Sequence, residues 1–316
     1  MTLGLPNKKE ERKNMREDKN AMWSYEAHMS HHKKHFEEGL DYLYALRNPK
    51  SLARRTLCRV YNVFHSLLKE SCSWLTIGDF TGVEAMYLTE QGQKAMASDI
   101  SDVYIKEAHR LKLIDAYDRI NVEQIEYGED AFDYVLCKES FHHFPRAYLG
   151  LYEMIRVAKK GVVLIEPTDV FCKMSSLVFL KNLCDLFNPN LINKLWKNRY
   201  SWEVVGNYVF KLSEREVEKA AMGMGLPCIA FKGVNIRLKP IPESWGDQKK
   251  IPIDKRLERK LDRYITRRDL LCKLGIIPHN HLCAIIFKEK PSAELLEDLR
   301  RDHFQVIELP PNPYLH

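Results

Sequence analysis

The sequence has no paired cysteines. Its eight cysteines stand singly, at positions 58, 72, 137, 172, 184, 228, 272 and 283, and no C-x-x-C pair occurs. Structural zinc sites use such pairs, and small secreted domains are held together by disulfide frameworks. The pattern therefore argues against both and indicates a reducing compartment.

Long apolar runs are absent too. The most apolar later stretch, 174–187, is interrupted by Lys181 and Asp185 and is too short to span a bilayer. The first ten residues contain no long apolar segment, which predicts no signal peptide. We therefore expect a cytoplasmic protein with no membrane span. The net charge of +6 permits an anionic partner but does not imply a nucleic acid.

The clearest folding signal lies in residues 132–167. Phe132–Cys137 is a nearly continuous apolar run, typical of a strand buried on both faces of a parallel sheet. A polar loop follows, then helical spacing over 147–158, a stop at Gly161 and a second apolar strand over 162–165. Ligands bind beyond the carboxyl ends of such strands, so we expect a site at Lys138–His143 and Glu166.

A glycine turn lies upstream. The sequence predicts a strand over 74–77, the turn Gly78-Asp79-Phe80-Thr81-Gly82, a helix over 83–91 and a strand over 95–97 that ends at Asp99. This order is typical of a mononucleotide-binding half, in which an acid at the second strand end bridges ribose hydroxyls. The turn lacks G-x-G-x-x-G because Phe80 replaces a glycine, so a dinucleotide pyrophosphate would fit poorly.

The rest of the chain predicts alternating helices and strands around this core. We expect an N-terminal leader and helical cap over 1–70, a core over 71–290 with insertions at about 168–200 and 235–280, and a C-terminal helix and tail over 291–316. Further elements are predicted as helices over 23–46, 51–70, 101–116, 170–198, 213–223, 255–274 and 292–304, and strands over 120–122, 228–231 and 282–287. The helix over 255–274 is basic and amphipathic, and we interpret its charged side as a solvated face.

Histidines gather on one face of the first predicted helix. His28, His31, His32 and His35 recur at steps of three and four residues. Such a face supplies metal ligands, but without an added carboxylate or cysteine it offers no closed geometry. We therefore expect a polar face near the mouth of a pocket and no metal.

Taken in order, several motifs resemble one family. The glycine turn, Asp99, Asn121-Val122, the strand 132–137, His142-His143-Phe144 and the segment 161–167 are similar to those of class I S-adenosylmethionine-dependent methyltransferases, most closely the type 11 domain group. The resemblance covers 70–170 well and 200–290 as general topology. It implies an α/β, Rossmann-like, doubly wound sheet of seven strands, mostly parallel with a reversed last strand.

The resemblance also implies cofactor contacts. Gly78, Asp79 and Gly82, with Phe80 between them, would wrap the methionine portion of S-adenosylmethionine. Asp99, followed by Ile100, would hold the ribose, and Asn121 and Val122 would lie beside the adenine. Lys138 and Glu139 would line the passage below the sulfonium. One departure is Thr76, which stands where the family usually has an acid; Asp79 inside the turn is the candidate replacement.

The implied activity is methyl transfer to a small molecule or saccharide, with O-methylation by in-line displacement and S-adenosylhomocysteine as product. Candidate bases are His142, His143 and Glu139, with His142 preferred slightly among the histidines; a scaffold role for the His-His-Phe cluster stays open. Acceptor contacts are expected from the N-terminal segment and the second strand end: Trp23, Tyr25, His28, His32 and Glu166. The basicity suits an anionic acceptor, and a homodimer stays open.

Two alternatives remain at this point. A catalytically inactive relative that serves as a binding or scaffold protein would account for Thr76. A nicotinamide-dependent oxidoreductase on a similar sheet is disfavoured by Phe80.

Overall fold

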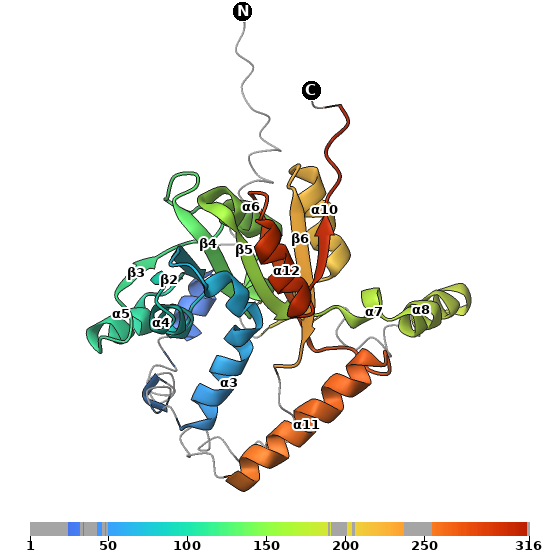
Figure 1. Cartoon of the computed structure of the whole chain (residues 1–316), viewed down its shortest axis with the longest axis horizontal. Helices are drawn as coiled ribbons and strands as arrows, with labels where there is room; N and C mark the ends of the chain where they lie inside the picture. The colour runs from blue at the N-terminus through green and yellow to red at the C-terminus, as the bar shows by residue number, and fades with distance from the viewer. Residues whose placement is uncertain are drawn as a thin grey trace, which may run out of the picture.

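The computed structural model describes residues 25–31, 34, 43–45, 48, 50–188, 190, 201–203, 206–236 and 255–314. Within these residues the strands form a single eight-stranded sheet in the order β3-β2-β1-β4-β5-β7-β6-β8 (Figure 1). The expectations for Trp23, His32 and His35 concern residues outside the described part of the chain.

Five strands form the parallel half of the sheet. They are β1 (Ser73–Ile77), β2 (Lys94–Asp99), β3 (Ala116–Arg119), β4 (Phe132–Lys138) and β5 (Ala158–Pro167). Each hydrogen-bonded pair among them is parallel, so their carboxyl ends meet at one edge of the sheet. The predicted strand over 120–122 is wrong: β3 ends at Arg119, and Ile120 and Val122 lie buried just beyond it.

The remaining three strands pair antiparallel with their neighbours. Strand β7 (His281–Phe287) is antiparallel to β5 and to β6 (Cys228–Val234), which confirms the expected reversed strand. Strand β8 (Gln305–Glu308) adds an eighth strand, antiparallel to β6 at the sheet edge. The sequence does not predict this strand. Its four residues, of which only Val306 and Ile307 are apolar, form a pattern too short to distinguish from an irregular tail.

Helices cover both faces of the sheet, as a doubly wound fold requires. One buried cluster packs α4 (Val83–Glu90), α5 (Val103–Arg110) and α12 (Ala293–Arg301) against the sheet. A second cluster packs α6 (Ala147–Val157) and α10 (Glu214–Gly223) against the other face. Burial of these two apolar layers is the main source of the fold's stability, because it removes nonpolar surface from water.

The segment before β1 belongs to the first of these layers. Helix α3 (Leu52–Tyr61) starts at Ser51, whose hydroxyl accepts a hydrogen bond from the backbone N–H of Arg54. It continues as the 3-10 segment η1 (Asn62–Leu68), with a kink at Phe64. Tyr61 and Phe64 are fully buried in the same cluster as residues of β1.

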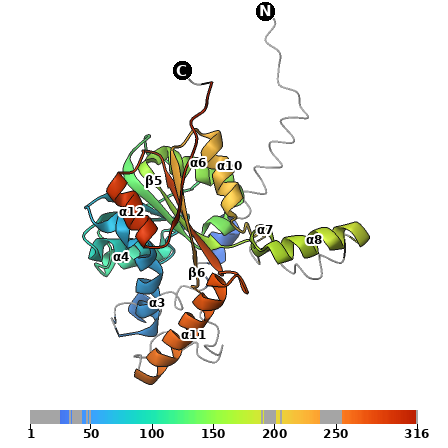
Figure 2. The ribbon, with the colours of Figure 1, turned by 45° about the vertical axis from the view of Figure 1, so that its right-hand side comes forward.

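Two helical segments lie at the periphery. Helices α7 (Val170–Lys173) and α8 (Ser175–Phe187) extend away from the sheet in both views, and α11 (Lys255–Lys273) runs along another side (Figures 1 and 2). Large apolar side chains of α8, among them Phe179 and Leu186, are exposed. No helix in the described part of the chain is both long enough and apolar enough to cross a membrane.

Candidate active site

The glycine turn joins two strand ends through a close backbone approach. Gly78 has a φ of +66°, and a Cβ atom placed there would lie only 2.4 Å from Cβ of Ser140. The Ser140 hydroxyl donates a hydrogen bond to the Gly78 carbonyl over 2.8 Å. A side chain at position 78 would therefore face both an unfavourable backbone conformation and a steric clash. Gly78 thus fixes the loop after β1 against the loop after β4.

A cavity of about 720 Å³ opens beside this turn, at the carboxyl ends of the parallel strands. Its size lies in the ordinary range for ligand sites. The cavity is lined by residues 25, 28, 31, 77, 78, 80, 99, 100, 120, 122, 139, 140, 143, 144, 201, 202, 203 and 209. The cavity lies at the edge of the sheet where parallel strands end, which is the edge where the sequence predicts a site.

Asp99 lies at the end of β2 and lines this cavity, although only 5% of it is exposed. Burial raises the pKa of Asp99 to about 7. Its Oδ1 accepts a hydrogen bond from the backbone N–H of Ser101 over 2.9 Å. Apolar side chains of Ile100, Ile120 and Val122 line the same cavity. A carboxylate beside an apolar wall suits a ribose and its attached base.

Asn121 and Phe80 differ in how they relate to the cavity. Asn121 lines a separate cavity of about 410 Å³, and its side-chain oxygen accepts a hydrogen bond from the backbone N–H of Glu123. Phe80 lines the main cavity, with its ring packed against Tyr104 at a centroid separation of 4.3 Å. Phe80 thus forms part of the wall, with cavity space beside it.

Asp79 lies inside the protein and does not line the cavity. Its carboxyl accepts hydrogen bonds from the Thr76 hydroxyl over 2.8 Å and from the backbone N–H of Ala85 over 2.9 Å. Burial, together with the nearby Glu84 carboxylate, raises the pKa of Asp79 well above its usual range. Asp79 therefore favours its neutral form more than an exposed aspartate does, and it caps α4 by accepting from the backbone N–H groups of Glu84 and Ala85. Thr76, in the position where the family carries an acid, contacts this group directly.

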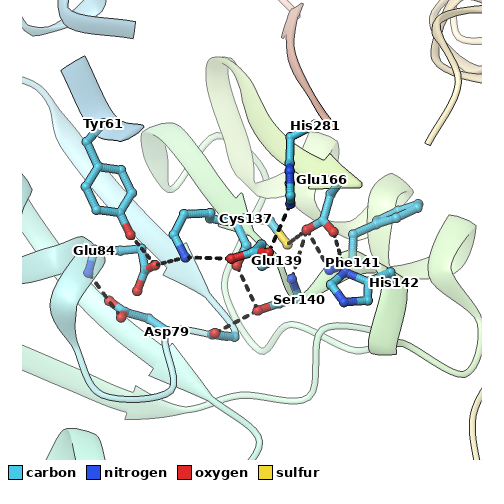
Figure 3. Close-up of polar contacts among 12 residues, drawn as sticks. Tyr61, Asp79, Glu84, Cys137, Glu139, Ser140, Phe141, His142, Glu166 and His281 are labelled. Atoms are coloured by element: carbon cyan, nitrogen blue, oxygen red, sulfur yellow. Dashed lines mark hydrogen bonds and ion pairs between the residues drawn. The ribbon is translucent and has the colours of Figure 1, made fainter. Parts of the chain in front are cut away.

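Lys138 turns towards the same buried group. Its Nζ lies 3.2 Å from Oε1 of Glu84, and the Tyr61 hydroxyl also donates to this carboxylate (Figure 3). Burial alone would raise the pKa of Glu84, but the Lys138 ammonium and these hydrogen bonds hold it below its usual value. The ionised pair ties α3, α4 and β4 together. Lys138 is not among the cavity-lining residues, in contrast to the adjacent Glu139.

Glu139 follows β4 in a strained backbone conformation, with a φ of +49°. Its side chain lines the cavity, and Oε1 lies 2.9 Å from Nε2 of His281, the first residue of β7 (Figure 3). His281 is 1% exposed. Left-handed conformations of non-glycine residues are costly and are concentrated at functional sites. This geometry holds a carboxylate at the tip of β4, in the cavity.

His142 and Glu166 form a buried clamp under the loop. Nδ1 of His142 lies 2.6 Å from Oε2 of Glu166, while Oε1 accepts hydrogen bonds from the backbone N–H groups of Ser140 and Phe141 (Figure 3). Burial alone would lower the pKa of His142, but the Glu166 carboxylate raises it above its usual value. Neither side chain lines the cavity, and Glu166 is fully buried. The clamp shapes the loop that carries Glu139 and His143.

The opposite wall comes from segments distant in sequence. His143 Nδ1 lies 2.6 Å from Oε2 of Glu203, and the rings of His28 and His143 meet edge to face at 5.6 Å. Burial, followed by the nearby His143, lowers the pKa of His28. Tyr25 lines this wall as well, and burial followed by the Glu123 carboxylate raises its pKa. The structure therefore brings Tyr25, His28 and His143 together at the cavity.

Two residues near the cavity, His281 and Glu203, were not predicted from the sequence. His281 opens an apolar strand more than a hundred positions after Glu139, so only the sheet register brings it close. Glu203 lies in an irregular segment without apolar periodicity, and nothing in the sequence singled it out. A local pattern cannot report a contact made through the tertiary fold.

Comparison with known proteins gives one family match. The model of the methyltransferase domain matches residues 75–165. None of the curated proteins matches the chain.

Three solved methyltransferases show partial similarity. One from Burkholderia thailandensis, 1,6-didemethyltoxoflavin-N1-methyltransferase, is 13% identical with a TM-score of 0.49, and the match covers 92% of this chain and 94% of that one. Magnesium protoporphyrin IX methyltransferase from Synechocystis is 18% identical with a TM-score of 0.38, covering 54% of this chain and 72% of that one. A protein from Thermotoga maritima is 13% identical with a TM-score of 0.44, covering 84% and 100%.

The residues at the cavity fit the cofactor of this family. Gly78 lines the cavity at the tip of β1, Asp99 offers a carboxylate at the next strand tip, and Ile100 and Val122 offer an apolar surface for a base. When bound there, S-adenosylmethionine supplies the electrophilic methyl group. Residues 75–165 match a methyltransferase domain, and this match supports S-adenosylmethionine-dependent methyl transfer as the activity.

Proposed function

We propose that the protein transfers a methyl group from S-adenosylmethionine to an oxygen atom of a small molecule or saccharide, with Glu139 as the proton acceptor. The observation that carries this proposal is the placement of Glu139. Its carboxylate lines the cavity at the tip of β4, in a strained conformation and in contact with the buried His281.

The reaction is an in-line displacement. The acceptor oxygen forms a bond to the methyl carbon as the bond from that carbon to sulfur breaks, and S-adenosylhomocysteine leaves. The hydroxyl proton passes to the Glu139 carboxylate, because an alcohol must lose its proton as it becomes an ether. The protein's main task is to align the three reacting atoms and to exclude water.

Glu139 is a better candidate for this proton than either histidine of the cluster. His142 faces away from the cavity towards Glu166, where it stabilises the loop. His143 also lines the cavity and keeps Nε2 for a proton while Nδ1 contacts Glu203, but its backbone lacks the strained conformation that marks Glu139. We therefore assign the base to Glu139 and place the acceptor between it and the wall of Tyr25, His28 and His143.

The net charge and the cysteines of the chain support two further proposals, one on the acceptor and one on the cellular compartment. The net charge of +6 favours an acceptor that carries a phosphate or carboxylate. The cysteines in the described part of the chain are free thiols, and this supports a reducing, cytoplasmic setting.

The test begins with the acceptor. The purified chain is incubated with S-adenosylmethionine labelled on its methyl group and with fractionated cell extracts, and labelled products are identified by mass spectrometry. Ligands that copurify with the chain are identified in the same way. We expect label on an oxygen atom of a single compound class. Label on nitrogen or carbon would overturn the O-methylation.

The role of Glu139 is tested with Glu139→Gln, which keeps the size of the side chain but cannot accept the proton. We expect turnover to fall by about a hundredfold or more with unchanged affinity for S-adenosylmethionine. Glu129→Gln, at an exposed position, is the matched control and should behave as the parent. Turnover within threefold of the parent for Glu139→Gln would remove the base. Absence of turnover by the parent on every fraction, with intact cofactor binding, would favour the inactive binding protein.

A further inference from the structure

A group of three metal-ligating side chains lines the same cavity as Glu139. It comprises His28, His143 and Glu203, each of which offers one ligand atom, and these atoms lie within 4.8 Å of one another. The three residues come from three separate segments of the chain, and all of them line the main cavity. We propose that they bind one divalent transition-metal ion, of which zinc is the probe used below.

The donor set matches this class of ion. Two imidazoles and one carboxylate are a recurrent ligand set of zinc sites in enzymes and of non-haem iron sites. Metal–ligand bonds of about 2.0–2.2 Å place two ligands of one ion no more than about 4.4 Å apart. The ligand atoms of the three residues already lie within 4.8 Å of one another, so binding needs only a small inward movement. The ion would enter beside the present contact between Nδ1 of His143 and Oε2 of Glu203.

The surroundings hold the ligands in place, as metal sites require. Nε2 of His28 lies 3.3 Å from Oδ1 of Asn207, whose Nδ2 donates to the backbone carbonyl of His142 over 3.4 Å. The clamp between His142 and Glu166 fixes the loop on which His143 lies. Each ligand is half-buried, so the site is neither a surface histidine pair nor sealed from the cavity.

The sequence alone predicted no metal because the histidine face of the first helix lacked a carboxylate. The tertiary fold supplies that carboxylate from Glu203, and a second imidazole from His143. Of the two histidines of that face that the structure describes, His28 and His31, His28 belongs to this group.

Three protein ligands leave coordination positions open, and the cavity adjoins them. An acceptor with an oxygen ligand, such as a hydroxyl beside a carboxylate or carbonyl, could bind the ion while its reacting oxygen faces Glu139. This consequence rests on the proposed function, whereas metal binding itself does not. The ion would then both orient the acceptor and make its hydroxyl more acidic.

The test measures zinc binding to the full chain by titration calorimetry, without the methyl donor, after treatment with a chelator. We expect one ion per chain. His28→Ala, His143→Ala and Glu203→Gln should each weaken binding by at least about tenfold. His65→Ala is the matched control, because His65 is half-exposed and lies outside the group, and it should bind as the parent does. Failure of the parent to bind zinc, or equal affinity in all four variants, would overturn the proposal.

Cobalt provides a second measurement that does not depend on affinity. Visible absorption of the cobalt-loaded parent should show the d–d bands of a low-coordinate site with nitrogen and oxygen ligands, and Glu203→Gln should lose them while its circular dichroism stays that of the parent. Bands that persist in Glu203→Gln would overturn the assignment of this ligand. Because both readouts precede any methyl transfer, loss of the metal site and loss of the methyltransferase activity are told apart.

Discussion

Nε2 of His281 lies 2.9 Å from Oε1 of Glu139, so the first residue of the reversed strand β7 contacts the residue that follows β4. The contact crosses β5, which separates the two strands in the sheet. Strand β7 therefore does more than complete the sheet: its buried imidazole orients the carboxylate that we assign as the base.

A first prediction concerns His281 as a positioning residue. His281→Leu should lower turnover by about tenfold or more while leaving the affinity for S-adenosylmethionine unchanged, because the carboxylate loses its fixed orientation. His281→Gln keeps a hydrogen-bond donor and should recover most of the turnover. Steady-state kinetics with the methyl acceptor measures both. If the Leu and Gln variants have equal turnover, the imidazole does not act through a hydrogen bond.

A second prediction concerns the pH dependence of cofactor binding. The pKa of Asp99 is about 7, raised by burial, so the side chain is mostly neutral at pH 6 and mostly ionised at pH 8. Ribose hydroxyls donate to the ionised form, so affinity for S-adenosylmethionine should rise with pH. If only that form binds, the dissociation constant should be about tenfold higher at pH 6 than at pH 8.

The variants for this experiment are Asp99→Asn and Asp115→Asn. The first should bind more weakly and with little dependence on pH, since its amide does not titrate. The second lies at an exposed position and should keep the slope of the parent. A flat profile in the parent would contradict the ribose role of Asp99.

A third prediction separates backbone strain from steric clash in the glycine turn. Gly78→Ala should destabilise the fold by more than Gly92→Ala, because Gly92 has a similar φ of +79° but no atom within 4 Å of the added Cβ. Each variant carries the backbone cost of about 1–3 kcal/mol, and only the first adds the clash with Ser140. Urea denaturation measures the difference. The double variant Gly78→Ala/Ser140→Gly should recover the part due to the clash.

A fourth prediction concerns the two neighbouring buried carboxyl groups. Burial and the Glu84 carboxylate raise the pKa of Asp79, so the neutral amide of Asp79→Asn should change the free energy of unfolding by no more than about 1 kcal/mol. Glu84→Gln should cost about 3–5 kcal/mol, because it removes the nearer of the two carboxylates beside the Lys138 ammonium, at 3.2 Å, and leaves only the Glu139 carboxylate at 3.8 Å. Thermal or urea unfolding near pH 7 compares the two. Equal losses would mean that both carboxyls are ionised.

A fifth prediction concerns the buried clamp. His142→Ala should lower the free energy of unfolding by about 3–5 kcal/mol, since it leaves the fully buried Glu166 carboxylate without its imidazole partner. Under conditions where the variant is folded, it should retain turnover within about tenfold, below the loss expected for a general base. A hundredfold loss of turnover in the folded variant would restore His142 as the base.

The parallel core could be predicted because its signals are local. The apolar run of β4, the turn at Gly78 and the acid at Asp99 each follow from residues adjacent in sequence, and all three lie where they were expected. The helix predicted over 213–223 is present as α10, and Ser213 and Glu216 form a capping box at its N-terminus. Helix α5, in contrast, ends at Arg110 instead of residue 116, because Lys112 adopts a left-handed conformation that the sequence does not signal.

The roles of individual polar residues were harder to predict because tertiary contacts decide them. The sequence placed His142, His143 and Glu139 in one loop but could not tell which side chain turns inward. The answer depends on Glu166 for His142, on Glu203 for His143 and on His281 for Glu139, all of them distant in sequence. Likewise, Lys138 is drawn to Glu84 by a charge that lies buried under α4.

The two sides of the cavity come from different parts of the chain. The turn at Gly78, Asp99 and Glu139 lie within residues 75–165, whereas His28 and Glu203 lie outside that segment. Exchange of the outer segments between related enzymes would therefore alter which compound is methylated and leave the donor apparatus intact. The choice of acceptor can therefore change in evolution without a change in the residues that surround the methyl donor.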